Sequence, residues 1–136
     1  MQRQPLTHRW VDGSRAPLYV LTYPRERQLA DMLASHDVVE DLYRRTQGPI
    51  GWIVDASKVT SATPKERQIV VAHERRVSET AALRCAGLAL VIPNALVRGF
   101  YTAIRWVEPA RCPCETFSGF DEAEMWVRAQ LASARS

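Results

Sequence analysis

The sequence predicts an α/β fold, a mixed and mostly parallel sheet of about five strands with four helices in the order β-β-α-β-α-β-α-β-α. Short, nearly all-apolar runs at 50–54 and 87–92 are typical of strands buried on both faces of a sheet. Around them, apolar residues recur every three or four positions, which indicates amphipathic helices. Strands separated by helices run parallel through right-handed crossovers, whereas two adjacent N-terminal strands make the sheet mixed.

The N-terminal part is expected to form a hairpin and then a helix. Residues 6–11 and 17–22 are its two strands, because the turn signal Asp12-Gly13-Ser14 lies between them. From Pro24 the period changes to that of a helix, which Pro24 fits as a first-turn residue and Gly48-Pro49 ends. His36 lies on the apolar stripe of this helix and is expected to be a core residue.

A second helix is predicted to begin at about Pro64. Thr63 is its cap, Pro64 takes the first helical position, and Glu66 completes a capping box. Its apolar positions are sparse, so we expect it to cover the sheet only thinly and to show a broad polar face.

The remaining elements are a third helix, a short strand and a final helix. Asn94 is a suitable cap for the third helix, which runs up to Pro109. One side of it is expected to be apolar (Leu96, Val97, Phe100, Ile104, Val107) and the other polar (Arg98, Thr102, Arg105). A strand near 114–117 and a helix opening at 118–121 complete the chain. Trp52, Trp106 and Trp126 are all expected to pack inward or at the boundary of the core.

Composition indicates one ordinary globular domain over 1–136, with a net charge of +3. Basic residues are interleaved with acids and form no stripe with aromatics between them, which argues against nucleic-acid binding. The longest apolar run holds about nine residues, whereas a membrane span needs roughly twenty. The N-terminus has no apolar stretch typical of a secretory signal, and three cysteines suit a reducing compartment. We therefore expect a cytoplasmic protein.

No motif for catalysis, nucleotide binding or metal binding is present. The chain has no glycine-rich phosphate loop. Cys112 and Cys114 are spaced as C-P-C, which does not match a zinc knuckle. We expect no cofactor, no metal and no enzymatic activity. An uncharacterised enzyme that uses Cys112, Cys114 or His73 is the alternative, with thiol or imidazole chemistry.

Two segments resemble STAS domains, the anti-sigma-factor-antagonist fold. Residues 55–60 read Asp-Ala-Ser-Lys-Val-Thr, similar to the D-[LF]-S-x-V-T strand end of that superfamily. Residues 117–126 resemble its ending and that of the SpoIIAA-like branch related to lipid-binding Sec14 domains. The element order is similar over nearly the whole chain. The resemblance implies a protein-interaction or regulatory module in bacterial signalling.

The chain departs from that family at its phosphorylation site. Phosphorylatable members continue as D-S-[ST]-G, whereas here Pro64 stands where the phosphoacceptor serine would be. The usual kinase-driven switch is therefore not expected at this position. Hydroxyl groups remain nearby, and a phosphate would be favoured at the start of a helix.

These observations leave three hypotheses for function. The leading one is a non-catalytic STAS-like module that docks an unidentified protein partner. The second is a carrier or sensor of a small lipid-like or anionic ligand, as in the Sec14-like branch, and the third is the enzyme. A homodimer is also considered because edge strands need cover. The residues expected to bind a partner or ligand are Asp55, Ser57, Thr60, Ser61, Thr63, Asn94, Arg98, Thr102 and Arg105.

Overall fold

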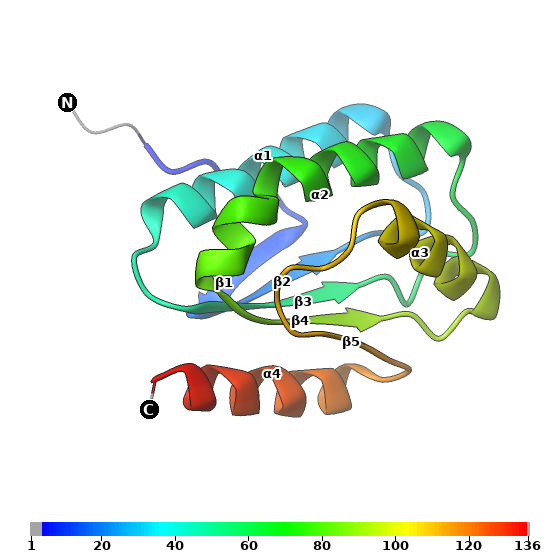
Figure 1. The fold of residues 1–136 in the computed structure, drawn as a ribbon. Coiled ribbons are helices and arrows are strands. Elements are labelled where there is room, and N and C mark those ends of the chain that lie inside the picture. The colour runs from blue at the N-terminus through cyan, green and yellow to red at the C-terminus, as the bar shows by residue number, and fades with distance from the viewer. Residues whose placement is uncertain (1–3, 136) are drawn as a thin grey trace.

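The computed structural model describes residues 4–135, which form a five-stranded sheet and four helices (Figure 1). The predicted α/β class and element order are confirmed. The strands are β1 (Val11–Arg15), β2 (Leu18–Thr22), β3 (Ile50–Asp55), β4 (Cys85–Val91) and β5 (Cys114–Phe117). The helices are α1 (Leu29–Arg45), α2 (Pro64–Arg84), α3 (Ala95–Val107) and α4 (Phe120–Arg135).

The strands are arranged in chain order, β1-β2-β3-β4-β5. β1 is antiparallel to β2, and the other neighbouring pairs are parallel. Each parallel crossover therefore moves one strand further in the same direction. Because such crossovers are right-handed, α1, α2 and α3 all lie on one face of the sheet, and α4 covers the other (Figure 1).

Two glycines let α4 pack directly on the strands. A Cβ atom at Gly51 would lie 2.4 Å from Cγ1 of Val127, and one at Gly87 would lie 3.0 Å from the side chain of Gln130. Any larger residue would push α4 away from the sheet. This face is filled by one buried apolar cluster, made of Leu18, Val20, Ile53, Ala89, Val91, Ala123, Val127 and Leu131.

The predicted hairpin has the wrong boundaries. Residues 12–14 lie inside β1 rather than in the turn, and the chain reverses at 16–17 instead. Asp12 Oδ1 accepts a hydrogen bond from the Ser14 amide at 2.9 Å, and the pairing of β1 with β2 shifts register between Asp12 and Arg15. The local turn signal therefore makes an irregularity within the strand.

The predicted start of the first helix is also wrong, because α1 begins at Leu29 and not at Pro24. The intervening loop is held by Arg27, whose guanidinium donates to the carbonyls of Pro24, Arg25 and Ser61. These tertiary and loop contacts replace the helical turn that Pro24 suggests.

The predicted start of α2 is confirmed at atomic level. The Thr63 hydroxyl accepts from the Glu66 amide at 3.1 Å, and the Glu66 carboxylate accepts from the Thr63 amide at 2.9 Å. Asn94 caps α3 as expected, accepting from the amides of Leu96 and Val97. Local sequence signals therefore fix both helix starts. Within residues 4–135, no helix combines the length and the apolar character that crossing a bilayer requires.

Candidate functional site

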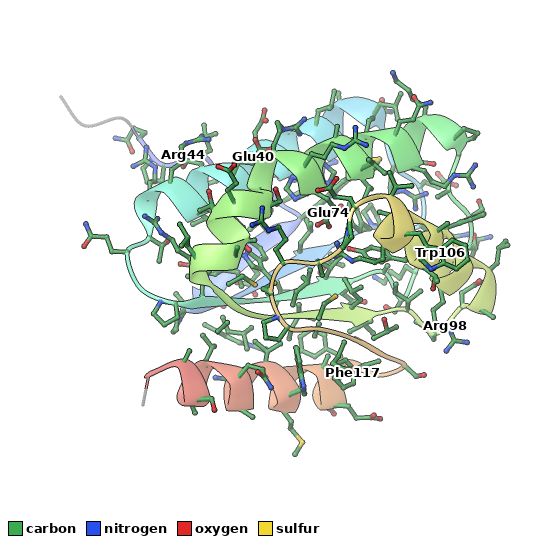
Figure 2. All side chains as sticks on the ribbon, in the orientation of Figure 1. Glu40, Arg44, Glu74, Arg98, Trp106 and Phe117 are labelled. Carbon is green, nitrogen blue, oxygen red and sulfur yellow. The ribbon has the colours of Figure 1, made fainter. Side chains whose placement is uncertain are left out.

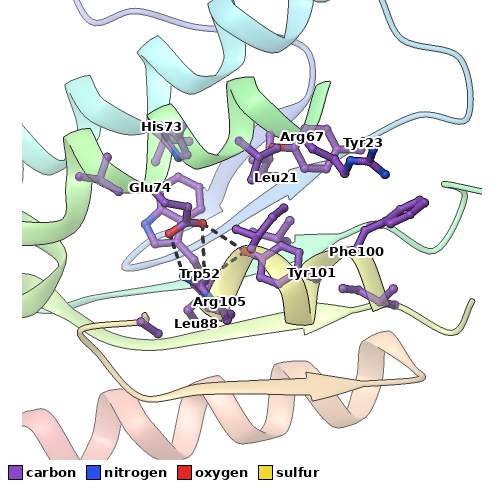
Figure 3. Close-up of a pocket in the computed structure, with 18 of the residues that line it drawn as sticks. Leu21, Tyr23, Trp52, Arg67, His73, Glu74, Leu88, Phe100, Tyr101 and Arg105 are labelled. Carbon is purple, nitrogen blue, oxygen red and sulfur yellow. Dashed lines mark hydrogen bonds and ion pairs between the residues drawn. The ribbon is translucent and has the colours of Figure 1, made fainter. Parts of the chain in front are cut away.

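A cavity of about 120 Å³ lies between α2, α3 and the sheet (Figure 3). Its floor includes Trp52 and Val54 of β3 and Leu88 of β4. Val54 and Leu88 are only half-buried although they belong to interior strands of the sheet. The thin cover expected from the sparse apolar positions of α2 therefore leaves open space above the middle of the sheet.

Helix α3 forms the second wall of the cavity and packs against the rest of the molecule with few side chains. Val97 and Ile104 are its buried residues. Tyr101 and Arg105, one turn apart, are partly buried and face the cavity. The predicted division of this helix into an apolar and a polar side is thus wrong for Arg105, which points inward, and for Leu96 and Val107, which are exposed.

An ion-pair network joins the two cavity walls (Figure 3). Glu74 of α2 accepts from Arg105 Nη1 and from the Tyr101 hydroxyl, each at 3.1 Å. Arg105 Nη2 also donates to the Tyr101 oxygen at 3.1 Å. The side chains of Glu74 and Arg105 are 16% and 17% exposed, so water screens this pair only partly.

The electrostatics of this network keep the guanidinium charged. Burial acts to lower the pKa of Arg105, but the neighbouring Tyr101 and Glu74 outweigh it and raise that pKa above its usual value. Burial, followed by the negative charge of Glu74, raises the pKa of Tyr101, so this phenol stays a hydrogen-bond donor at neutral pH. Arg105 therefore stays charged and Tyr101 stays protonated near neutral pH.

A second ion pair lies on the cavity wall at the start of α2. Arg27 Nε donates to Glu66 Oε2 at 2.7 Å. Burial acts to raise the pKa of Glu66, but the hydrogen bonds from Arg27 and Thr63 lower it below the usual range. Glu66 thus takes part in both the capping box of α2 and the ion pair with Arg27, which neutralises its charge.

Two histidines stack beside the cavity. The rings of His36 (α1) and His73 (α2) lie 4.1 Å apart between centroids, and His36 Nε2 is hydrogen-bonded to the Tyr23 hydroxyl at 2.6 Å. His73, which lines the cavity, lies 3.5 Å from a carboxylate oxygen of Glu40 through Nδ1. Burial, and then the charges of His73 and Arg76, lower the pKa of His36 to about 2. His36 is therefore a neutral core residue.

The two candidate cysteines, Cys112 and Cys114, have the properties of packed thiols, whereas the hydrogen bond with Cys112 lowers the pKa of the buried Cys85. Cys112 lines the cavity, and its hydrogen bond with Cys85 together with burial raises its pKa. Burial also raises the pKa of Cys114. A thiolate nucleophile needs the opposite shift. Among residues 4–135, no three His, Cys, Asp or Glu side chains group as they would around a metal ion.

The residues predicted from the end of β3 lie at the last residue of that strand and in the loop that follows it. Asp55 is half-buried, and its Oδ1 accepts from the Ser57 amide at 3.0 Å. Ser57, Thr60 and Ser61 are exposed, and the Ser61 carbonyl accepts from Arg27. Together with the capping Thr63, these groups shape the loop between β3 and α2, and none of the five lines the cavity.

The predicted residues on α3 separate into two groups. Arg98 and Thr102 are exposed on its outer side, and the Thr102 hydroxyl donates to the Arg98 carbonyl. Arg105 lies in the cavity, and Asn94 is occupied as the cap. Trp106 is 81% exposed, so the prediction that it packs inward or at the boundary of the core is wrong (Figure 2). Its position four residues after Thr102 places it on the same outer stripe.

The sequence indicated only core packing for Trp52 and no site role for Glu74 or Tyr101. One signal was available, because Tyr101 and Arg105 are four residues apart and flank the inward-facing Ile104. Glu74 had no such signal, since its partners lie 27 and 31 residues away in the chain. The STAS resemblance points to the loop, whereas the concave site lies beside it.

Comparisons of the chain with protein-family models, with curated proteins and with solved structures found no match. The resemblance to STAS domains therefore stays a prediction.

Proposed function

We propose that this protein binds a small, mainly apolar molecule in the cavity between α2, α3 and the sheet, as a non-catalytic cytoplasmic carrier or sensor. The observation that carries the proposal is the cavity itself. Its walls are mostly apolar, with a few charged groups held in fixed pairs. This combination is typical of small-ligand sites.

The size of the cavity supports a role in binding. Protein interiors are close-packed, so a space of about 120 Å³ above the middle of the sheet has room for a small molecule. Engineered apolar cavities of about 150 Å³ take up benzene. The matching ligand here has about the size of a substituted benzene ring.

The arrangement of polar groups favours binding over catalysis. Cys112 and Cys114 have raised pKa values, which oppose nucleophilic attack. Arg105 and Glu66 are each held in an ion pair on the cavity wall. His73 is the remaining candidate base, and its Nδ1 is directed at Glu40.

The test is to fill the cavity. Val70 lines it, whereas its neighbour Val71 does not and lies on the outer side of α2. Toluene should raise the unfolding midpoint of the wild type by about 4 °C at ten times its Kd. Val70→Phe should abolish this shift, and Val71→Phe should retain it. An equal shift in both variants would mean that toluene binds elsewhere and would refute the proposal.

A second candidate is the STAS-like protein-interaction module, with a second copy of this chain as partner. Its support is the outer side of α3, where Trp106 and Val107 are 81% and 59% exposed, and the confirmed element order on which the resemblance rests. Exposed apolar groups of this kind often mark interfaces. The edge strands β1 and β5 are further surfaces for association.

Sedimentation over a range of concentrations tests the homodimer. The mass should rise towards that of a dimer in the wild type and in Met125→Ser, which changes an exposed residue on the opposite face. Trp106→Ser should keep the chain monomeric. A wild-type chain that stays monomeric at every concentration would rule the homodimer out.

A further inference from the structure

Two arginines that line the cavity have no carboxylate partner. The cavity is lined by four arginines but only two glutamates. The glutamates, Glu66 and Glu74, are each already held in an ion pair with one of these arginines. Within residues 4–135, the side chains of Arg67 and Arg111 form no ion pair and donate no hydrogen bond. The cavity lining therefore carries positive charge that its own acidic side chains do not balance.

Arg67 is held where α2 and α3 meet. Its Cζ atom lies over the Phe100 ring of α3, 4.5 Å from the ring centroid (Figure 3). A guanidinium that stacks on a ring uses its face, so its N–H groups remain available to an acceptor. Arg67 also borders a shallow groove on the outer side of α2, so it lies at the mouth of the cavity. Because it is only half-buried there, both solvent and a ligand in the cavity can reach it.

An unpaired guanidinium at the mouth of an apolar cavity selects an anionic head group. A carboxylate accepts two parallel N–H bonds from one guanidinium, and such bonds are stronger than those to neutral acceptors. A head group at the mouth keeps contact with water, which avoids the cost of burying a charge completely. Further inside, the lining includes Val54 and Leu88 and suits a hydrocarbon body. The two parts of the site thus match the two parts of an amphipathic acid.

We infer that the ligand is a small apolar carboxylic acid, whose carboxylate pairs with Arg67 at the mouth of the cavity while its hydrocarbon body fills the space inside. This inference rests on the proposed function, because it assumes that the cavity takes up a small molecule. It adds the chemical class of that molecule and the side chain that recognises its charge. Arg111, in the loop after α3, is exposed and contributes only a screened charge.

Matched acids and amides test the charge of the head group. Phenylacetate and 3-phenylpropanoate differ in the length of the link between ring and carboxylate, and each has a neutral amide of the same heavy-atom skeleton. In calorimetry at low salt, the better-fitting acid should bind about tenfold more tightly than its amide. Added salt should weaken binding of the acid and leave that of the amide unchanged. Val70→Phe, which fills the cavity, should abolish binding of both.

Variants locate the recognition at Arg67. Arg67→Gln should remove most of the preference for acid over amide, with the amide itself still bound. Arg67→Lys keeps the charge but loses the planar fork, so it should retain part of the preference. Arg98→Gln is the matched control. Arg98 also lacks a carboxylate partner within residues 4–135, but it is exposed on the outer side of α3 and does not line the cavity. This variant changes the net charge equally and should keep the full preference.

The remaining outcomes overturn the inference in distinguishable ways. Equal affinities for acid and amide would mean that the charge is not recognised, and the proposed function would survive. A preference lost in Arg111→Gln but kept in Arg67→Gln would move the recognition to the loop after α3. Tighter binding of benzylphosphonate than of phenylacetate would assign the site to phosphoryl groups. Acid binding that persists in Val70→Phe would place the acid outside the cavity. If toluene, the acids and the amides all fail to bind, the proposed function fails as well.

Discussion

His36 and His73 stack with their ring centroids 4.1 Å apart, although they belong to different helices and lie 37 positions apart in the chain (73 − 36). The contact joins α1 to α2 in the layer above the sheet. On one side of the stack, the Tyr23 hydroxyl is hydrogen-bonded to His36. On the other side, Glu40 contacts His73 and accepts a hydrogen bond from Arg76. The buried imidazole of His36 in this stack tolerates protonation poorly, because burial lowers its pKa.

Acid should destabilise the protein before its carboxylates titrate. The pKa of His36 is about 2 in the folded chain and about 6.5 when unfolded, so the unfolded state binds the extra proton first. The contribution of His36 to stability is fully present above pH 6.5 and should be lost as pH drops below it, with a limiting slope of about 1.4 kcal/mol per pH unit. Urea unfolding between pH 7 and 5 measures this slope.

Variants assign the slope to His36. His36→Phe should flatten it, whereas Tyr23→Phe removes the hydrogen bond but keeps the imidazole and should retain it. The carboxylates with lowered pKa values, Glu40 and Glu66 among them, lose their contribution at lower pH. An unchanged slope in His36→Phe would exclude His36 as its source.

Breaking the pair of Glu74 and Arg105 should be costly. Glu74→Gln leaves the guanidinium without its counter-charge, and we expect a loss of about 3 kcal/mol in the free energy of unfolding. The double variant Glu74→Leu/Arg105→Met should recover much of that loss. Denaturant titration measures both.

The exposed pair of Arg128 and Glu124 on α4 is the matched control, with side chains 54% and 24% exposed. Arg128→Ala should cost no more than about 0.5 kcal/mol. A comparable loss at both pairs would show that burial does not set the strength of the inner one.

Thr63 should contribute to stability through its cap, unlike the other hydroxyls of its loop. Thr63→Ala removes the acceptor of the Glu66 amide and should cost about 1 kcal/mol. Thr60→Ala, at an exposed position of the same loop, should change stability by less than about 0.5 kcal/mol. Thermal unfolding compares the two, and equal effects would argue against the cap.

Gly51 should not tolerate a methyl group. Gly51→Ala places a Cβ against Val127, and overpacking of this kind costs about 1 to 3 kcal/mol. Gly48→Ala is the control, because a Cβ there meets nothing within 4 Å. Adding Val127→Ala should make the double variant more stable than the sum of the two single losses predicts. Strict additivity would contradict the contact.

The elements that the sequence predicts well are those with local signals. One is the capping box formed by Thr63 and Glu66, and the other is the apolar run 50–54. The residues of each signal lie within a few positions of one another, so short-range rules are enough to predict the element. Pro24 and Asp12 carry equally local signals. The bonds of Arg27 to the loop and to the distant Ser61 carbonyl override the first, and a register shift between β1 and β2 accommodates the second.

The cavity was beyond sequence reasoning because it depends on contacts between distant segments. Glu74 reads as a solvated helix residue until α3 brings Arg105 opposite it. Trp52 reads as core packing, and only the three-dimensional arrangement leaves its indole N–H unpaired. The element order is a property of the chain, whereas an unfilled volume is a property of how the elements meet.

The glycines under α4 make the packing of the two faces of the sheet unequal. The α4 side is closely packed, because even a methyl group at Gly51 would collide with Val127. On the other side lies a cavity of about 120 Å³. Hydrostatic pressure acts on void volume. Structural changes under pressure should therefore be concentrated in α2 and α3, whereas α4 and the strands that it covers should change little.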